Sequence, residues 1–268
     1  MKGYFALLEE RSRAIGSLVC VSLDPDPKRT PLDSVVAYNS LIIEATAPFA
    51  ACFKPNIAFY EQWGAPGLRA LEQTRRAIPA GIPVIGDVKR GDIGSTAEAY
   101  ARAMFEAWDF DAITLNPYLG RDSIEPFLAY EGRGIYVVCR TSNPGAAEFQ
   151  DATVNAERPL YEHVAATVTA WSPNIGLVVG ATAPAELRRV RELVPRVSLL
   201  VPGVGAQGGR PMDVIAAAGG EPGTIVVNAS RSIYYAAPAA ELDAGTALAA
   251  ALAAKNLRDE LAAARATA

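Results

Sequence analysis

Short, continuous apolar runs recur along the chain and predict buried β-strands. Each run holds four to six residues and is rich in valine, isoleucine and leucine, without the strict alternation of a half-exposed strand. The eight runs are 18–23, 50–53, 83–88, 112–115, 135–139, 175–179, 198–201 and 224–227. Strands of this kind are typical of a parallel sheet that helices cover on its outer face.

Stretches with helical periodicity lie between these runs, for example 33–47, 65–77 and 97–107. Alternating strands and helices imply parallel pairing through helical crossovers, and eight such units close a barrel. We therefore expect an α/β fold, a single-domain (β/α)8 TIM barrel that spans 1–268. The alanine-rich stretch 242–268 predicts that the last barrel helix continues as an extra C-terminal helix.

Local signals also mark where two of the helices begin. The sequence Ser95-Thr96-Ala97-Glu98 predicts a capping box, in which Ser95 caps the helix. Thr182 with Pro184 predicts the start of another helix. The segment 146–158 is compatible either with a lid or with a surface excursion.

Composition narrows the class of protein. The chain has 268 residues, near the size of about 250 that is typical of one barrel domain, and 50% of them are hydrophobic. A formal net charge of −4 argues against a nucleic acid or a membrane surface as the partner. Charges interrupt the segment 1–13, unlike a secretory signal, and no apolar run could span a membrane. We expect a cytoplasmic protein.

Cysteine and histidine give no sign of a metal centre. Cys20, Cys52 and Cys139 each fall inside a predicted strand, and their odd number without CxxC spacing predicts buried thiols rather than disulfides or a zinc site. The single histidine, His163, lies in a helical run and is expected on an outer helix. A serine triad is not supported.

Polar residues gather where the predicted strands end, which is where barrel enzymes place their active sites. The chain has five lysines against twenty arginines, and two of the five, Lys54 and Lys89, stand at strand ends. The use of lysine rather than arginine at these two positions suggests that a compact, titratable ammonium is needed there. The other polar or glycine-rich strand ends are Asp24, Asp87, Asn116, 140–142, 180–182, 202–209 and 228–231.

The stretch 84–96 is the most informative of these. Asp87 and Lys89 are two residues apart on a predicted strand and should therefore share a face, and Asp92 follows in the loop. Two acids beside one lysine favour its charged form and leave it ready to donate a proton. The alternative is a salt-bridge network without catalytic function.

Glycines after the seventh strand predict a phosphate site. Gly203 and Gly205 follow that strand and Arg231 follows the eighth, at the position where barrels bind phosphate through backbone N–H groups. Because glycine pairs also occur in ordinary turns, the prediction of a phosphate site rests on their position after the seventh strand.

Taken together, these motifs resemble the orotidine 5′-phosphate decarboxylase family in its longer bacterial form. The pattern Asp87-x-Lys89-x-x-Asp92-Ile93-x-x-Thr96 is similar to that family's signature, and three further motifs, 53–55, 141–145 and 202–209, follow in the family's order. The resemblance extends from Asp24 to 230–234, most of the chain. It implies cofactor-free and metal-free decarboxylation of orotidine 5′-monophosphate to UMP and CO2, the last step of de novo pyrimidine nucleotide synthesis.

The resemblance also implies residue roles. Lys89 would stabilise and protonate a carbanion at C6, with Asp87 beside the departing carboxylate and Lys54 bridging Asp87 and the ribose. The implied substrate-binding set is Asp24 for a ribose hydroxyl, Ser142 for the pyrimidine, Gln207 and Arg231 for the phosphate, and Thr96, Pro202, Gly208 and Ser230. Family members are homodimers, so Asp92 and Thr96 would reach into the partner's site.

Simpler roles remain open for several of these residues. Asp24 lies in Asp-Pro-Asp-Pro and could form a turn, Thr96 could belong to a helix cap, and Ser142 could serve a turn before Asn-Pro-Gly. Whether Thr141 or Ser142 would meet the base is also open.

Other functions compete with the decarboxylase. A magnesium-dependent sugar-phosphate lyase similar to 3-keto-gulonate 6-phosphate decarboxylase or hexulose 6-phosphate synthase would carry an acid where this chain has Lys54. A Schiff-base aldolase would need a neutral lysine, which flanking acids disfavour. A nucleotide-binding regulator on an inactive barrel would be expected to lack Lys89 or one of the acids.

Overall fold

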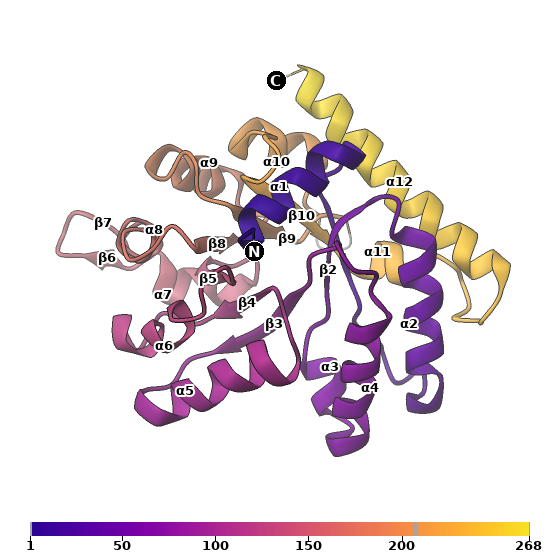
Figure 1. Cartoon of the computed structure of the whole chain (residues 1–268). Helices are drawn as coiled ribbons and strands as arrows, with labels where there is room; N and C mark the ends of the chain where they lie inside the picture. The colour runs from indigo at the N-terminus through magenta and orange to yellow at the C-terminus, as the bar shows by residue number, and fades with distance from the viewer. Residues whose placement is uncertain (1, 206–207, 268) are drawn as a thin grey trace.

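The computed structural model describes residues 2–205 and 208–267, and its centre is a ring of eight parallel strands. Their order is β2-β1-β10-β9-β8-β5-β4-β3, and the isolated bridges Phe53–Val84 and Asn56–Asp87 join β2 to β3, so that the barrel is nearly closed (Figure 1). The strands are β1 (Val19–Ser22), β2 (Ala50–Lys54), β3 (Ile85–Arg90), β4 (Ala112–Leu115), β5 (Gly134–Arg140), β8 (Ile175–Val179), β9 (Leu199–Pro202) and β10 (Ile225–Ala229). All eight expected strands are confirmed.

Helices surround this ring (Figure 1). The longer ones are α2 (Leu32–Thr46), α4 (Gly64–Ala77), α5 (Gly94–Arg102), α8 (Leu160–Thr169), α9 (Pro184–Leu193), α10 (Pro211–Ala218) and α12 (Ala244–Thr267). Short helices are α3 (Ala58–Glu61), α6 (Glu125–Leu128), α7 (Ala147–Gln150) and α11 (Arg231–Tyr234). The extra C-terminal helix is confirmed, because α12 packs against α2, α10 and α11.

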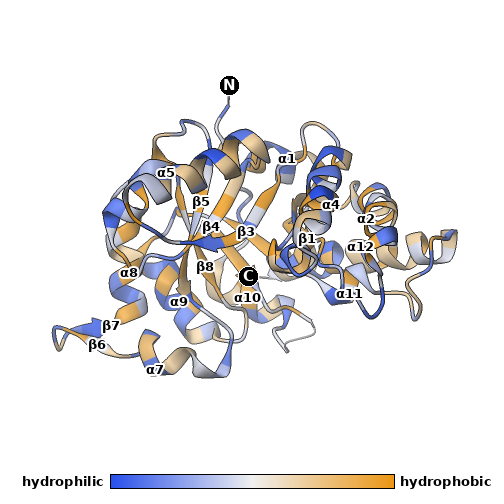
Figure 2. Cartoon of the chain, turned by 90° about the horizontal axis from the view of Figure 1, so that it is seen from below, coloured by the Kyte–Doolittle hydropathy of each residue, from blue (hydrophilic) through white to orange (hydrophobic). Residues whose placement is uncertain are grey.

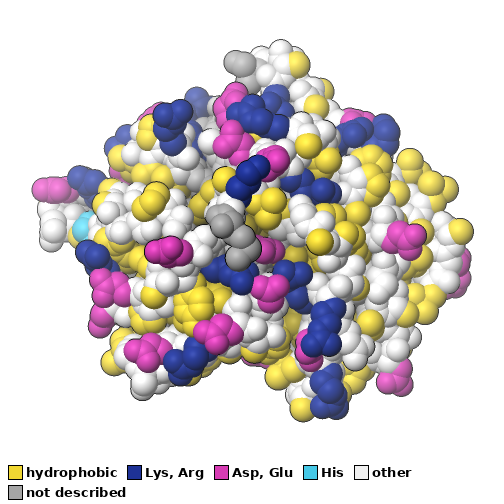
Figure 3. Space-filling view, viewed as in Figure 1, with side chains coloured by type: hydrophobic (Ala, Val, Ile, Leu, Met, Phe, Trp, Pro, Cys, Tyr) yellow, Lys and Arg dark blue, Asp and Glu magenta, His cyan; other side chains and the backbone are white. Residues whose placement is uncertain are grey.

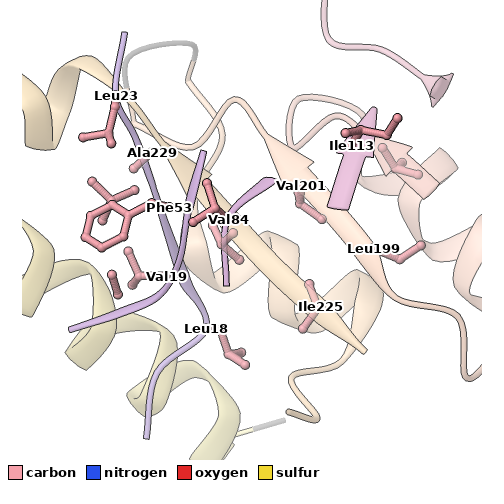
Figure 4. Close-up of a cluster of buried hydrophobic side chains, with 14 of the residues drawn as sticks. Leu18, Val19, Leu23, Phe53, Val84, Ile113, Leu199, Val201, Ile225 and Ala229 are labelled. Carbon is pink, nitrogen blue, oxygen red and sulfur yellow. The ribbon is translucent and has the colours of Figure 1, made fainter. Parts of the chain in front are cut away.

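The core has two clusters of buried side chains, as expected for strands buried on both faces. In Figure 2 the central strands are mostly hydrophobic, and the surrounding helices carry both hydrophobic and hydrophilic residues. Side chains on the outer faces of the strands, such as Val19, Phe53 and Val84, pack under the helices (Figure 4). A smaller cluster fills the inside of the barrel, and it includes Cys20 and Cys52. The cysteines are buried and free, as expected.

The N-terminal helix α1 (Tyr4–Ile15) closes the N-terminal end of the barrel. Its Tyr4 and Leu8 are buried in the inner cluster, and the Tyr4 hydroxyl hydrogen-bonds that of Tyr136 on β5 (3.3 Å). Because this end is filled, a ligand can enter the barrel only from the carboxyl ends of the strands. None of the described helices is long and apolar enough to cross a membrane.

The expected capping box is wrong. Helix α5 begins at Gly94 with Ile93 at the N-cap, and no side chain caps it. The Ile93 N–H instead donates to the Asp92 carboxylate (2.9 Å), and Gly94 turns the chain at φ 54°, so the helix starts before Ser95 can act as the cap. The expected helix 97–107 also ends in one π-helical turn, η1 (Ala103–Ala107).

Helix α9 begins at Pro184, as expected, but Thr182 is not its cap. Ala183 occupies the N-cap, and the Thr182 hydroxyl lies 3.4 Å from the Ser142 carbonyl oxygen. The segment 146–158 contains α7 and the antiparallel hairpin β6 (Thr153–Val154) and β7 (Arg158–Pro159). This hairpin projects away from the ring (Figure 1), which favours a surface excursion over a lid.

Candidate active site

A cavity of about 640 Å³ opens at the carboxyl ends of the strands. Eight of the expected site residues line it, namely Asp24, Lys54, Asp87, Lys89, Ser142, Pro202, Ser230 and Arg231. Asp26 and Arg29, which were not among the expected site residues, also line the cavity. Its wall therefore holds three acidic and four cationic side chains. The cavity gathers these charges in one place, whereas on the face of the molecule seen in Figure 3 charged residues of both signs are scattered among other residues.

Asp87 is the centre of the charged groups. Its Oδ2 atom accepts hydrogen bonds from Lys54 Nζ (2.9 Å) and Asn56 Nδ2 (3.3 Å). Its Oδ1 atom accepts from Lys89 Nζ (2.5 Å) and Thr114 Oγ1 (2.9 Å). Each carboxylate oxygen thus meets one ammonium and one neutral donor.

This pairing determines the charge states. Burial alone would raise the pKa of Asp87, but the charges of Lys54 and Lys89 outweigh burial and hold the pKa well below its usual value. Burial alone would lower the pKa of Lys54, yet the charges of Asp87 and Asp24 raise it. The site therefore holds an ionised carboxylate between ammonium groups at neutral pH.

Lys89 reaches Asp87 by a different route from the one expected. Simple strand alternation does not extend through 87–89, because the β3–β4 register shifts there and Lys89 has a left-handed φ of 42°. The two side chains still lie together, as predicted, but a bulge produces the contact. The Lys89 side chain is 49% exposed, which leaves its ammonium accessible to a bound molecule.

Asp24 bridges two strand ends instead of forming a local turn. Its carboxylate accepts hydrogen bonds from Ser230 Oγ (2.8 Å) and the Asn56 N–H (3.1 Å). Burial raises its pKa, and the charge of Lys54 opposes this rise. A turn was the simpler alternative for Asp24, but Asp26 forms such a turn instead, because its Oδ1 accepts the Lys28 N–H (2.9 Å).

The loop after β9 contributes residues to the cavity that Arg231 also lines. Gly203 and Gly205 have φ of 104° and 79°, conformations that favour glycine, and the Gly205 N–H donates to the Gly209 carbonyl (3.0 Å). Gly203 lines the cavity together with Arg231. Gly208 does not line it, and Gln207 lies outside the described residues.

The loop that carries Ser142 is anchored by hydrogen bonds to α7, which belongs to the segment 146–158. Gln150 on α7 accepts the Thr141 N–H and donates to Thr141 Oγ1, both at 2.8 Å. A Cβ atom at Gly180 would lie 2.9 Å from the Ser142 Cβ, so only glycine lets the two loops approach closely. Both Thr141 and Ser142 line the cavity.

Comparison with known proteins narrows the functions that such a site allows. The model of the family described as "Orotidine 5'-phosphate decarboxylase / HUMPS family" matches residues 17–244. The chain belongs to this family.

Relatives with this activity match most of the chain. An orotidine 5'-phosphate decarboxylase of Thermomicrobium roseum is 47% identical over 266 residues, 95% of this chain and 93% of the relative. One of Halorubrum lacusprofundi is 53% identical over 215 residues, 77% of this chain and 76% of the relative. The structure of Leishmania donovani OMP decarboxylase superposes with a TM-score of 0.87 at 41% identity and covers 98% of this chain and 99% of that one.

The enzyme is thus a carboxy-lyase that converts orotidine 5′-monophosphate to UMP and CO2, the last step of pyrimidine biosynthesis. Within the described ranges, no group of three or more His, Cys, Asp and Glu residues is arranged to hold a metal ion. The wall position that the rival lyases would fill with an acid carries the Lys54 ammonium, paired with Asp87.

Asp92 and Thr96, like Gly208, lie apart from the cavity. Asp92 is partly exposed in the loop before α5, and Thr96 is exposed on the first turn of that helix. Neither lines the cavity of its own chain.

Sequence reasoning also missed residues that the fold brings into the wall. The clearest are Asn56 and Thr114, which both donate to Asp87. Asn56 follows Lys54 by two residues, a spacing that could have indicated it. Thr114 is the only hydroxyl residue in the run 112–115, but an isolated threonine in an apolar strand is common, so the signal is weak.

Proposed function

We propose that Lys89 carries out the chemistry of decarboxylation. Loss of CO2 leaves a negative charge at C6 of the pyrimidine, with no adjacent carbonyl group to delocalise it. An ammonium in the cavity wall stabilises this carbanion and then donates a proton to C6. The observation that supports the role is the pairing of Lys89 Nζ with the buried Asp87 carboxylate, which directs a charged amine into the cavity.

The magnitudes indicate that Lys89 does not act alone. Two unit charges about 4 Å apart interact by roughly 4 kcal/mol at an effective dielectric near 20. Enzymatic rate enhancements correspond to about 8 to 23 kcal/mol. The remainder comes from binding energy of the distant phosphate and ribose groups, which orders the site around the reacting ring.

The other wall residues suit the remaining parts of the substrate. Asp24 and Lys54 bind ribose hydroxyls, since both stand at strand ends beside the central ion pairs. Ser142 contacts the pyrimidine from the β5 side. Arg231, just after β10, and Gln207 bind the phosphate. Pro202, Gly208 and Ser230 remain the other members of the expected substrate-binding set.

A homodimer completes this site with Asp92 and Thr96 of the partner subunit. The loops that follow the neighbouring strands β3 and β4 carry exposed apolar side chains, namely Ile93 (56% exposed), Tyr118 (84%) and Leu119 (47%). Asp92 directly precedes Ile93 in the chain, and Thr96 follows it by three residues. Exposed apolar side chains of this size favour a protein interface. A two-fold interface there would exchange the same residues between both subunits.

The test is Lys89→Ala, assayed by the loss of ultraviolet absorbance of orotidine 5′-monophosphate. We expect the turnover rate to fall by about 10⁴-fold or more, because both the proton donor and the charge at C6 are lost. Affinity for UMP should stay within about tenfold, since that product has no carbanion to stabilise.

Lys255→Ala on α12 is the matched control, because it removes an exposed lysine that pairs with the nearby Asp259, and it should leave turnover unchanged. Near-normal turnover of Lys89→Ala would contradict the proposed role. Wild-type activity should also persist in EDTA, and loss of activity on chelation would favour the magnesium-dependent alternative.

A further inference from the structure

The bulge in β3 leaves backbone groups that the barrel ladder cannot satisfy. Gly86 pairs with Ile113 and Arg90 pairs with Leu115, so three residues of β3 face a single residue of β4, Thr114. Two backbone N–H groups in this bulge, those of Val88 and Lys89, need an acceptor other than the ladder carbonyls.

The Thr114 side chain supplies that acceptor. Its Oγ1 accepts hydrogen bonds from the N–H groups of Val88 and Lys89, both at 2.9 Å. Its own hydroxyl hydrogen donates to Asp87 Oδ1 at 2.9 Å. A hydroxyl has one donor and two acceptor positions, so all three are used by consecutive residues of β3. Thr114 is 1% exposed, which excludes water as a ready substitute.

These contacts hold Lys89 in a conformation that lysine rarely adopts. At φ 42° its backbone is in the left-handed region, which is unfavourable for a side chain with a Cβ atom. The same conformation turns the ammonium back toward Asp87. Thr114 thus contacts both the strained backbone of Lys89 and the carboxylate oxygen that its ammonium binds.

We propose that the Thr114 hydroxyl is a positioning group for the reaction, which holds Asp87 and Lys89 in the geometry that protonates C6. The inference rests on the proposed role of Lys89. Without the hydroxyl, the bulge would relax to satisfy its amides and the ammonium would shift from its place. A displacement of about 1 Å can reduce an enzymatic rate by about a hundredfold.

The experiment compares Thr114→Val, which keeps the shape but removes the hydroxyl, with Thr114→Ser, which keeps the hydroxyl. We expect Thr114→Val to lose about a hundredfold in kcat, with UMP affinity within about threefold of the wild type. Thr114→Ser should recover most of that loss. Thr46→Val is the matched control, because Thr46 is equally buried and its hydroxyl donates to the Ile42 carbonyl within α2.

Wild-type kcat in Thr114→Val, alongside an inactive Lys89→Ala, would overturn this inference and leave the role of Lys89 intact. Equal loss in Thr114→Val and Thr114→Ser would show that keeping the hydroxyl does not restore the rate, and would assign the effect to side-chain packing at this position. Equal loss in Thr46→Val would assign it to general destabilisation. Either result would refute the proposal. If Thr114→Val does not fold, Thr114→Ala removes the same hydroxyl and carries the same expectation.

Discussion

Asp87 is a charged side chain held inside a barrel, and its contacts explain why it stays ionised. A buried carboxylate costs several kcal/mol unless it is paired and hydrogen-bonded. Here two ammonium groups and two neutral donors occupy both oxygens, and the Asp87 side chain is only 10% exposed. Removal of any one donor should therefore change the hydrogen bonds of the other donors, because all of them share one carboxylate.

The lowered pKa of Asp87 predicts an acid-sensitive contribution to stability. An unfolded aspartate binds a proton near its ordinary pKa of about 3.9, whereas native Asp87 stays ionised. Its contribution is thus complete above that value and is lost as the pH falls toward the lowered native pKa. One such group changes the free energy of unfolding by up to about 1.4 kcal/mol per pH unit.

Urea unfolding of the wild type and Asp87→Asn at about pH 4 and about pH 3 measures this contribution. The wild type should lose about 1 kcal/mol more than the variant over that interval, although the variant is less stable at both values. Parallel losses in the two proteins would show that Asp87 protonates alike in both states, contrary to this prediction.

At the scale of elements, Arg191 connects α9 to the loops around the N-terminal ends of β9 and β10. Its guanidinium donates to five backbone carbonyls, those of Val194, Pro195, Val197, Ala218 and Thr224, at 2.7 to 3.3 Å. Burial lowers the pKa of Arg191 to about 10. The side chain therefore satisfies carbonyl groups that regular secondary structure leaves without donors.

Arg191→Met keeps the length of the side chain but removes all five hydrogen bonds. We expect the free energy of unfolding to fall by about 2–4 kcal/mol, because partly buried carbonyls lose their donors. Arg188→Met on the exposed face of the same helix should change it by less than about 0.5 kcal/mol. Chemical denaturation compares the two, and similar values would mean that the carbonyl contacts contribute little to stability.

At the scale of the whole molecule, the barrel directs chemistry to one end. Helix α1 fills the N-terminal end, and the charged cavity lies at the other, where eight strand ends converge. Asp92 and Thr96 remain outside that cavity. A second copy of the chain is the partner that would give both residues a place in the site.

Mixing inactive Lys89→Ala and Asp92→Ala subunits tests this arrangement. In a heterodimer one site would combine an intact Lys89 with the other subunit's intact Asp92, so random mixing should restore about a quarter of wild-type activity. As a control, Lys89→Ala mixed with Lys54→Ala should stay inactive, because each site would lack one lysine of its own chain. Verified heterodimers without activity would contradict a shared site.

The strands and their order in the chain could be predicted from the sequence because burial on both faces leaves a continuous apolar signal. The expected run 112–115 coincides with β4, and 175–179 coincides with β8. Helix starts were less predictable. The residues 95–98 match a capping box, but the helix begins earlier, at Gly94, where the chain turns. The local sequence pattern does not show which of these two possible start positions the helix uses.

By itself, the sequence determined that apolar strands alternate with helices and that charged residues follow the strands, because both properties belong to neighbours along the chain. Only the tertiary structure decided which of those charges meet. Lys54, Asp87 and Thr114 lie 27 or more residues from one another, and their contacts depend on how the strands register across the barrel. The register of β3 against β4 also sets the backbone of Lys89, which no pattern along the chain encodes.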